Sequence, residues 1–390
     1  MIAEEVEKAV KLIKKGIQRD AVLKRIRGYP PLTKDDIFEI AKTKIKAREK
    51  FGELAERLFF DEEGLRYATP EVVARYRAER LKCGIIADVS CGAGAQLVFF
   101  GLHCEKAYGV EIDRKRAFLA MLNAKQLGLD NVEIIVGDAL DDATIRKISD
   151  AEIIFSDPAR PPNEKVRTME NLFPNPLKVY EKYIKVTPEM AFELPPQMPP
   201  ERVKQSLSGE KEYVSLNFKL NRLALYTGEL AEHDVSAVSL PSGEKVTSED
   251  ERVKLEKGEP ELKDLKSFIY EVDYTVVKAS LLENLAGKLG FNGIIVEQDN
   301  RRVLLSSDQE YSSHFLRRYD VLDVVPFTTF QINRKLKELG AKKVTLRFSL
   351  SPKEYWEVRK KMEEGLEGER WLYLFRIGDK GVIAEPCEKV

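Results

Sequence analysis

The stretch Ala87-Asp88-Val89-Ser90-Cys91-Gly92-Ala93-Gly94-Ala95 decides the fold, because it follows a short apolar strand and opens a helical segment. Glycines at such a turn let the backbone approach a ligand closely, and the helix that follows supplies free amide groups. Apolar strands and helical stretches then alternate, with strands expected at 84–88, 106–110, 131–135 and 151–156. This alternation predicts βαβ units and a parallel sheet.

A dinucleotide ligand is disfavoured at this turn. The dinucleotide motif needs a small residue three positions after its second glycine, so that the helix can pack closely on the sheet. Here that position, counted from Gly94, holds Leu97, which is expected to obstruct the packing. The turn therefore indicates another nucleotide-type cofactor.

Acidic residues follow the next strands in order. Glu111 ends the second strand, at the place where a carboxylate can accept hydrogen bonds from ribose hydroxyls, about 20 residues after the glycine turn. Asp138 follows the third strand and Asp157 the fourth. Each acid alone could be a helix N-cap or a solvated strand end. Asp88, Glu111 and Asp138, in order on three consecutive strands, favour a cofactor site.

These motifs resemble those of class I methyltransferases that use S-adenosylmethionine. The resemblance implies that Asp88 lies near the methionine end, Glu111 at the ribose and Asp138 at the adenine amino group. Ser90 stands where many members have glycine. The cofactor residues that the resemblance implies are Asp88, Ser90, Cys91, Gly92, Gly94, Glu111, Ile112, Asp138 and Ala139.

The segment Ser156-Asp157-Pro158-Ala159-Arg160 resembles the Asn/Asp/Ser-Pro-Pro-aromatic motif of methyltransferases that modify exocyclic amines of nucleobases. An aryl amine is a poor nucleophile because its lone pair is delocalised into the ring. The Asp157 carboxylate and the Pro158 carbonyl could hold its hydrogens, fixed by the restricted geometry of proline. A proline-rich turn that merely ends a strand is the alternative.

Arg160 departs from the amine motif, which usually has an aromatic residue there. An Asp-Pro-x-Arg order also occurs in enzymes that methylate C5 of pyrimidines through a cysteine thiolate. No cysteine lies between Cys104 and Cys387, so that mechanism has no evident nucleophile. We therefore expect Arg160 in the catalytic site to bind a phosphate or stack on a base, and Phe173 either to sandwich the base or simply to pack.

Two helical stretches precede the sheet. Val6, Val10, Ile13 and Ile17 recur at helical spacing, and a second amphipathic stretch begins at the N-cap Thr33. The alternating charges favour a helical cap over an independent binding module. The segment Tyr67-Ala68-Thr69-Pro70-Glu71 begins another helix and also resembles a segment of trimethylguanosine synthase.

The carboxy-terminal part, including His314 to Phe327 and Lys342 to Arg347, is similar to a THUMP-like domain. True THUMP domains are associated with RNA, so the resemblance implies RNA contacts. A basic cluster there suits phosphate groups, although a solvated surface is the alternative. Its members are Arg301, Arg302, Arg317, Arg318, Arg334, Lys335, Lys342, Lys343 and Arg347, of which we predict substrate contacts for Arg317, Arg318, Lys342 and Lys343.

Composition limits the class of protein. The chain has 390 residues, 43% of them hydrophobic, and a net charge of -1, which excludes a disordered chain, a collagen or a disulfide scaffold. Four cysteines without a CxxC pair and three dispersed histidines predict no metal site. No long apolar run or secretory signal is present, so a cytoplasmic location without membrane contact is expected. No obligate protein partner is evident.

The combined prediction is an α/β protein of three domains: a helical segment at 1–64, a Rossmann-like methyltransferase domain at 65–262, and an α+β THUMP-like domain at 263–390. The expected function is methylation of an exocyclic amine in structured ribosomal or transfer RNA. Cytosine N4 is slightly preferred, guanine N2 is next and adenine N6 follows. A protein or small-molecule methyltransferase and a non-catalytic RNA-binding protein are the alternatives.

Overall fold

The computed structural model describes residues 2–159, 169–258, 265–298 and 302–387. The chain forms two compact units, Met1–Glu212 with Arg222–Asp234, and Tyr213–Asn221 with Val235–Val390. This division keeps the amino-terminal helices with the first sheet and starts the second unit ahead of the charged stretch at 248–260. The division into three domains at 1–64, 65–262 and 263–390 stays a prediction.

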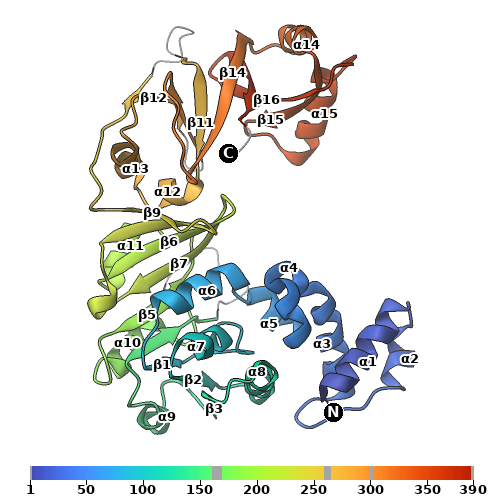
Figure 1. The fold of residues 1–390 in the computed structure, drawn as a ribbon, viewed down its shortest axis with the longest axis vertical. Helices are drawn as coiled ribbons and strands as arrows, with labels where there is room; N and C mark the ends of the chain where they lie inside the picture. Colours follow the sequence, from blue (N-terminus) through green and yellow to red (C-terminus); the bar gives the residue numbers. More distant parts are fainter. Residues whose placement is uncertain (1, 160–168, 259–264, 299–301, 388–390) are drawn as a thin grey trace. The chain divides into compact units, whose positions relative to one another are not determined.

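The first unit contains the predicted parallel α/β sheet. Its strands lie in the order β3-β2-β1-β4-β5, and all four neighbouring pairs are parallel. These strands are β1 (Ile85–Asp88), β2 (Lys106–Glu111), β3 (Val132–Val136), β4 (Ile153–Ser156) and β5 (Met190–Leu194). The helices connecting them are α7 (Leu97–His103), α8 (Arg114–Leu127), α9 (Asp142–Lys147) and α10 (Pro176–Tyr183), and Figure 1 shows them around this sheet.

Leu97 does not obstruct the packing of α7 on the sheet, contrary to the expectation from its size. Its side chain is fully buried and lies directly over Gly109 of β2. A Cβ on Gly109 would stand 2.4 Å from the Leu97 Cδ2 atom, so the glycine in the strand provides the room that the leucine needs. The small residue that close packing requires is on the sheet rather than on the helix.

The amino-terminal helices share one hydrophobic core with this sheet. They are α1 (Ile2–Lys14), α2 (Arg19–Leu23), α3 (Lys34–Lys46), α4 (Arg48–Phe51), η1 (Gly52–Arg57) and α5 (Glu62–Tyr67). Thr33 caps α3 in a capping box with Asp36. The buried Asn123 of α8 accepts a hydrogen bond from the Phe59 N–H (2.7 Å) and donates to the Phe59 and Ala93 carbonyls. The segment therefore packs as part of the first unit.

The alternating segments 212–216 and 222–226, which flank a short turn, predict a hairpin at the edge of the sheet. The hairpin forms, but it does not lie at the edge. Strand β7 (Leu220–Tyr226) pairs antiparallel with β5, and β6 (Glu210–Leu216) lies next to β7. Strands β8 (Val235–Leu240) and β9 (Glu244–Thr247) then extend the sheet to nine strands. The elements α11 (Pro200–Ser206) and η2 (Gly228–Leu230) flank the hairpin. Because β8 pairs next to β6, the hairpin becomes an interior part of the sheet.

The second unit contains an eight-stranded sheet in the order β10-β12-β13-β11-β14-β17-β16-β15. The strands are β10 (Glu256–Lys257), β11 (Phe268–Val272), β12 (Ile294–Gln298), β13 (Val303–Ser307), β14 (Leu316–Pro326), β15 (Ala341–Arg347), β16 (Arg370–Ile377) and β17 (Lys380–Pro386). Its helices are α12 (Tyr274–Lys278), α13 (Leu282–Leu289), α14 (Thr329–Glu338) and α15 (Pro352–Met362). No helix in the described ranges is long and apolar enough to cross a membrane.

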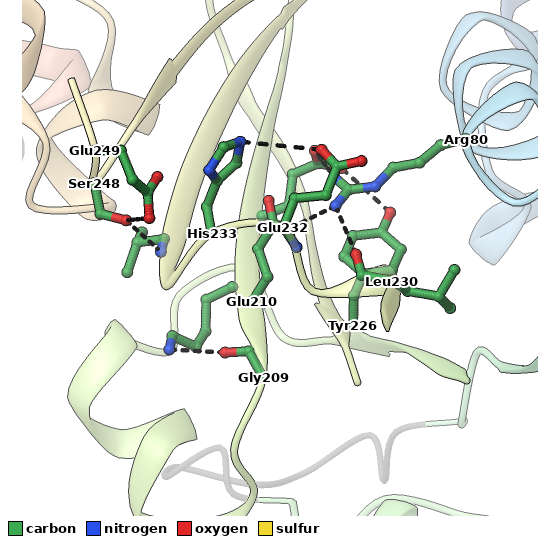
Figure 2. A network of polar contacts seen from close by, with 12 residues as sticks. Arg80, Gly209, Glu210, Tyr226, Leu230, Glu232, His233, Ser248 and Glu249 are labelled. Carbon is green, nitrogen blue, oxygen red and sulfur yellow. Dashed lines mark hydrogen bonds and ion pairs between the residues drawn. The ribbon is translucent and has the colours of Figure 1, made fainter. Parts of the chain in front are cut away.

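Helix α6 (Glu71–Arg80) is held to the first sheet by a buried ionic network (Figure 2). Arg80 donates to the Glu210 carboxylate (2.6 Å), forms an ion pair with Glu212 and lies 3.7 Å from the centroid of the Tyr226 ring. Both carboxylates are fully buried. One guanidinium therefore contacts two buried carboxylates in this network.

Replacing Arg80 is expected to destabilise the first unit strongly. Arg80→Met keeps most of the side-chain length but removes the guanidinium that contacts the buried carboxylates of Glu210 and Glu212, which should lower the free energy of unfolding by about 3–5 kcal/mol. Arg75 is the matched control, because it pairs with Glu71 on the same helix while half of its own side chain is exposed. Arg75→Met should cost below about 1 kcal/mol. Urea unfolding of both variants checks this, and equal losses would contradict it.

Candidate functional site

The loops that follow β1, β2, β3 and β4 meet at one edge of the first sheet. Asp88 of β1 lies opposite Gly109 of β2 on one side and Phe155 of β4 on the other. Because carboxyl ends of parallel strands share an edge, Asp88, Glu111 and Asp157 are brought to neighbouring positions, with Asp138 beyond Glu111. Open α/β sheets bind ligands at this edge.

Glu111 organises the glycine turn. One oxygen of its carboxylate accepts a hydrogen bond from the Gly92 N–H (2.9 Å), and the other accepts from the Asp113 N–H (2.8 Å). Gly92 and Gly94 both have positive φ, which favours glycine. A Cβ on Gly92 would meet no atom within 4 Å, whereas one on Gly94 would stand 3.1 Å from Ala120 of α8. The turn thus presents open backbone at Gly92 and packs tightly at Gly94.

Asp88 is buried, and the pKa of its carboxyl is raised. Its carboxylate accepts a hydrogen bond from the Ser90 N–H (3.1 Å), and only 1% of the residue is exposed. Burial raises the pKa of the Asp88 carboxyl to about 8, repulsion from Asp157 and Glu111 adds to this, and the hydrogen bond from Ser90 opposes it. A cationic ligand group at this edge would favour the ionised form.

The adenine positions implied by the resemblance lie at the ends of β2 and β3. Ile112 leaves 55% of its surface exposed directly after Glu111, so an apolar side chain is available to a flat ring. The Asp138 carboxylate accepts from the Leu140 N–H (2.8 Å), and the Ala139 carbonyl accepts from the buried Tyr183 hydroxyl (2.7 Å). These bonds hold the loop after β3 in one conformation.

Ser90 joins the cofactor turn to the Asp157 turn. The Ser90 hydroxyl accepts a hydrogen bond from the Asp157 N–H (2.7 Å) and lies 3.3 Å from the hydroxyl of Ser156, which is itself fully buried. A glycine at position 90 could make neither contact. The departure from the family motif at Ser90 therefore positions the backbone of Asp157.

The surroundings of Cys91 disfavour a nucleophilic thiolate. Its thiol is buried against Gly109 and contacts the Gly92 carbonyl (3.7 Å). Burial raises the pKa of this thiol well above its ordinary value, and Asp88 and Glu111 raise it further. The thiolate that a C5 methylation mechanism needs is thus disfavoured at this cysteine.

Phe173 lies beside the Asp157 turn. Ala159 and Phe173 form an isolated antiparallel bridge, in which the Ala159 N–H donates to the Phe173 carbonyl (2.7 Å) and the Phe173 N–H donates back (3.0 Å). The Phe173 side chain is 58% exposed, so it does not belong to the core. Pro158 is buried, and Arg160 lies outside the described residues.

Sequence patterns missed an ionic group behind the Asp157 turn. The buried Arg77 of α6 donates to Gln96 (3.0 Å) and forms an ion pair with the buried Glu193 of β5, which also contacts the Arg222 Nε atom at 3.1 Å. Asp157 is close enough to Arg77 to help raise the pKa of its guanidinium. Helix α6 has little amphipathic pattern, so its sequence does not show which arginine is buried.

Lys50 was also missed, and it holds the segment around Thr69-Pro70. Its ammonium donates to the carbonyls of Leu65 (2.8 Å), Arg66 (2.8 Å) and Ala68 (2.9 Å), which closes the end of α5. Burial lowers the pKa of Lys50 to about 8, and repulsion from Arg222 lowers it further. This cap leaves the Tyr67 ring 51% exposed.

Much of the basic cluster expected in the carboxy-terminal part is neutralised by ion pairs. Arg302 and Arg347 contact Glu271, Arg318 pairs with Glu310 and Asp320, Arg334 pairs with Glu338, and Lys335 pairs with Asp323 and Glu338. The two pairs with Glu338 follow from helical spacing within α14, whereas Glu271 reaches Arg302 and Arg347 only through the folding of the sheet, which spacing along the chain does not reveal. Arg317 lies over the Phe218 ring (4.1 Å), Lys342 and Lys343 are exposed on β15, and Arg301 lies outside the described residues.

Comparisons with known proteins identify the first unit. Residues 83–196 match the family model described as RNA cap guanine-N2 methyltransferase, and this range includes the strand ends described above. The chain is an S-adenosylmethionine-dependent methyltransferase of the class I fold. The residues at this edge fit the cofactor, because Gly92 leaves open backbone beside a hydrogen-bonded Glu111 and an exposed Ile112.

Individual relatives extend the similarity beyond this range. An uncharacterised S-adenosylmethionine-dependent methyltransferase of Mycobacterium tuberculosis (strain ATCC 25618 / H37Rv) is 26% identical over 318 residues, covering 77% of this chain and 82% of that protein. An uncharacterised RNA methyltransferase of Clostridium acetobutylicum is 36% identical over 83 residues, covering 21% of this chain and 18% of that protein. A solved methyltransferase structure from Porphyromonas gingivalis W83 shares the fold over 99% of both chains, with a TM-score of 0.77 and 18% identity.

The pKa of Asp88 predicts a pH dependence of stability. Because the folded value of about 8 exceeds the ordinary value of 3.8, the folded methyltransferase keeps a proton that the unfolded chain releases. The free energy of unfolding contributed by this group therefore falls as pH rises from about 4 to about 8. Asp88→Asn cannot titrate, so it should lose less stability than the parent over this window. Urea unfolding of the ligand-free proteins at several pH values checks this, and identical slopes would contradict it.

Loss of the Ser90 hydroxyl should slow methyl transfer. Ser90→Ala leaves the Asp157 N–H without its acceptor, at a cost of about 1 kcal/mol, so kcat should fall by roughly fivefold to tenfold. The affinity for S-adenosylmethionine should change little, and Ser90→Thr, which keeps a hydroxyl, should retain most of the rate. Steady-state rates and calorimetric cofactor binding separate the two effects. A loss confined to cofactor affinity would refute the positioning role.

Proposed function

We propose that the methyltransferase modifies an exocyclic amino group of a base in RNA. The observation that carries this proposal is the Asp157 turn at the carboxyl end of β4, anchored by Ser90 on one side and paired with Phe173 on the other. It combines an acceptor for amine hydrogens with an exposed aromatic ring. The match to a guanine-N2 methyltransferase model and the similarity to proteins named RNA methyltransferases support the same substrate class.

The proposed role of Asp157 is to make the exocyclic amino group, which is a poor nucleophile, reactive. Its carboxylate would accept a hydrogen from the amino group and turn the nitrogen lone pair out of conjugation, and the Pro158 carbonyl would accept the second hydrogen. Bound S-adenosylmethionine would supply the electrophilic methyl group on its sulfonium. Asp157 would stabilise the positive charge that develops on nitrogen until that nitrogen loses a proton, and S-adenosylhomocysteine would be the other product.

Guanine N2 becomes the first candidate base, ahead of cytosine N4. The Ser156-Asp157-Pro158 order favours cytosine N4 by resemblance, whereas the family model that matches residues 83–196 is described by guanine N2. Ribosomal and transfer RNA are both kept as targets. The second unit is proposed as the THUMP-like part that contacts this RNA.

The direct test supplies RNA from cells lacking the methyltransferase with labelled S-adenosylmethionine, followed by digestion and mass spectrometry of the nucleosides. We expect labelled N2-methylguanosine or N4-methylcytidine. Asp157→Ala should reduce the label at least a hundredfold, because both the acceptor and the charge stabilisation are lost. Asp142→Ala, an exposed acid on α9, is the control and should leave the label unchanged. Label in protein and none in RNA would refute the proposal.

Phe173 should affect RNA binding more than the chemical step. Phe173→Ala removes an exposed ring that can stack on the base, so the KM for RNA should rise about fivefold to tenfold. Phe173→Tyr keeps the ring and should behave like the parent. Kinetics with saturating cofactor measure this, and a KM that is equal in all three proteins would assign Phe173 to local packing alone.

A further inference from the structure

The face of β15 and β16 that is opposite α15 is buried at Phe375 and exposed at Trp371, where it carries an aromatic ring and a lysine. Val344 and Leu346 of β15, with Leu372 and Leu374 of β16, join a buried core with residues of α14 and α15. Figure 1 shows α15 lying against these strands. Side chains alternate along a strand, so Lys343, Thr345, Trp371 and Tyr373 are on the opposite face. The register confirms that they are neighbours, since Lys343 pairs with Trp371 and Thr345 with Tyr373.

Trp371 is exposed and yet fixed in orientation. More than half of its surface (54%) is accessible, although large aromatic side chains are usually covered. Its indole Nε1–H donates to the Thr345 hydroxyl at 2.7 Å, which ties the ring across the two strands. An aromatic plane held in this way can accept a second flat ring without a further loss of rotamer freedom.

Positive charge surrounds this ring. The Lys343 ammonium lies 5.4 Å from the centroid of the Trp371 ring, and Lys342 is exposed next to it on β15, the last strand of the sheet. Within the described part of the chain, neither lysine forms an ion pair, in contrast to Arg347 and Arg318. The segment 328–371 carries eleven Lys and Arg residues against seven Asp and Glu residues, whereas the whole chain has a net charge of -1. The excess charge is suited to a polyanion.

We propose that Trp371 is a stacking platform for an unpaired base of RNA, with Lys342 and Lys343 contacting the adjoining phosphates. This inference rests on the proposed function, because RNA supplies both the base and the phosphate. A base inside a duplex already has stacked neighbours, so the platform selects a single-stranded segment or loop. The surface therefore gives the methyltransferase a contact to unpaired RNA on an element separate from the Asp157 turn.

The chain has two tryptophans, which allows a direct test. Trp356→Phe leaves Trp371 as the sole indole, and Trp371→Phe leaves Trp356, a 65% exposed residue of α15. Titration with oligoadenylate should quench the emission of the Trp356→Phe protein, because a stacked base quenches indole fluorescence, and should leave the Trp371→Phe emission nearly unchanged. Heparin, a polyanion without bases, should bind the Trp356→Phe protein without quenching it.

Affinity supplies the second measurement. Trp371→Ala should weaken oligoadenylate binding about tenfold, and the combined Lys342→Ala and Lys343→Ala variant should weaken binding and lower its salt dependence. Phe330→Ala, which removes a 71% exposed ring from α14, is the control and should change little. Thermal unfolding verifies that each variant is folded.

Equal quenching of the two single-tryptophan proteins, or an unchanged affinity of Trp371→Ala, would overturn the inference. Because these titrations use no methyl transfer, they can fail while RNA is still methylated. The proposed function fails separately, if labelled methyl groups enter no RNA nucleoside.

Discussion

The parallel pairing of β1 with β4 is the constraint on which the site depends. It places Asp88, the last residue of β1, opposite Phe155 of β4, so that the loops that follow the two strands start side by side. The bond from the Asp157 N–H to the Ser90 hydroxyl then joins the two loops. The turn that contains Gly92 and the turn that contains Asp157 are thereby held at a fixed separation, which the proposed in-line methyl transfer requires.

The first unit separates its charges into two groups. Carboxylates gather at the ligand edge, where burial and mutual repulsion raise the pKa of Asp88. The balancing guanidinium groups are behind the turns, in the pairs that Arg77 and Arg80 form with buried glutamates. Helix α6 carries both arginines, so it fastens the sheet and also sets the electrostatic surroundings of Asp157.

In the second unit, ion pairs balance several of the basic residues that the sequence groups together. Arg302, Arg318 and Arg347 contribute little free positive charge because carboxylates on neighbouring strands or loops meet them. Lys342 and Lys343 lie on the outermost strand, near the exposed Trp371 ring, and their positive charges are not balanced by an ion pair in the described part of the chain. Because β15 ends the sheet, only β16 lies next to it, and no second strand places side chains beside these lysines.

The sequence by itself determined the parallel α/β sheet and the order of the acidic strand ends, because alternation of apolar strands with helices and residues at strand ends are local patterns. It also indicated Phe173, which the structure brings to Ala159. Only the tertiary structure decided that Gly109 makes room for Leu97, that Ser90 holds Asp157, and that Arg77, Lys50 and Trp371 have particular partners. Those contacts join residues from different elements, and their energies depend on burial and on distance in space, which spacing along the chain does not encode.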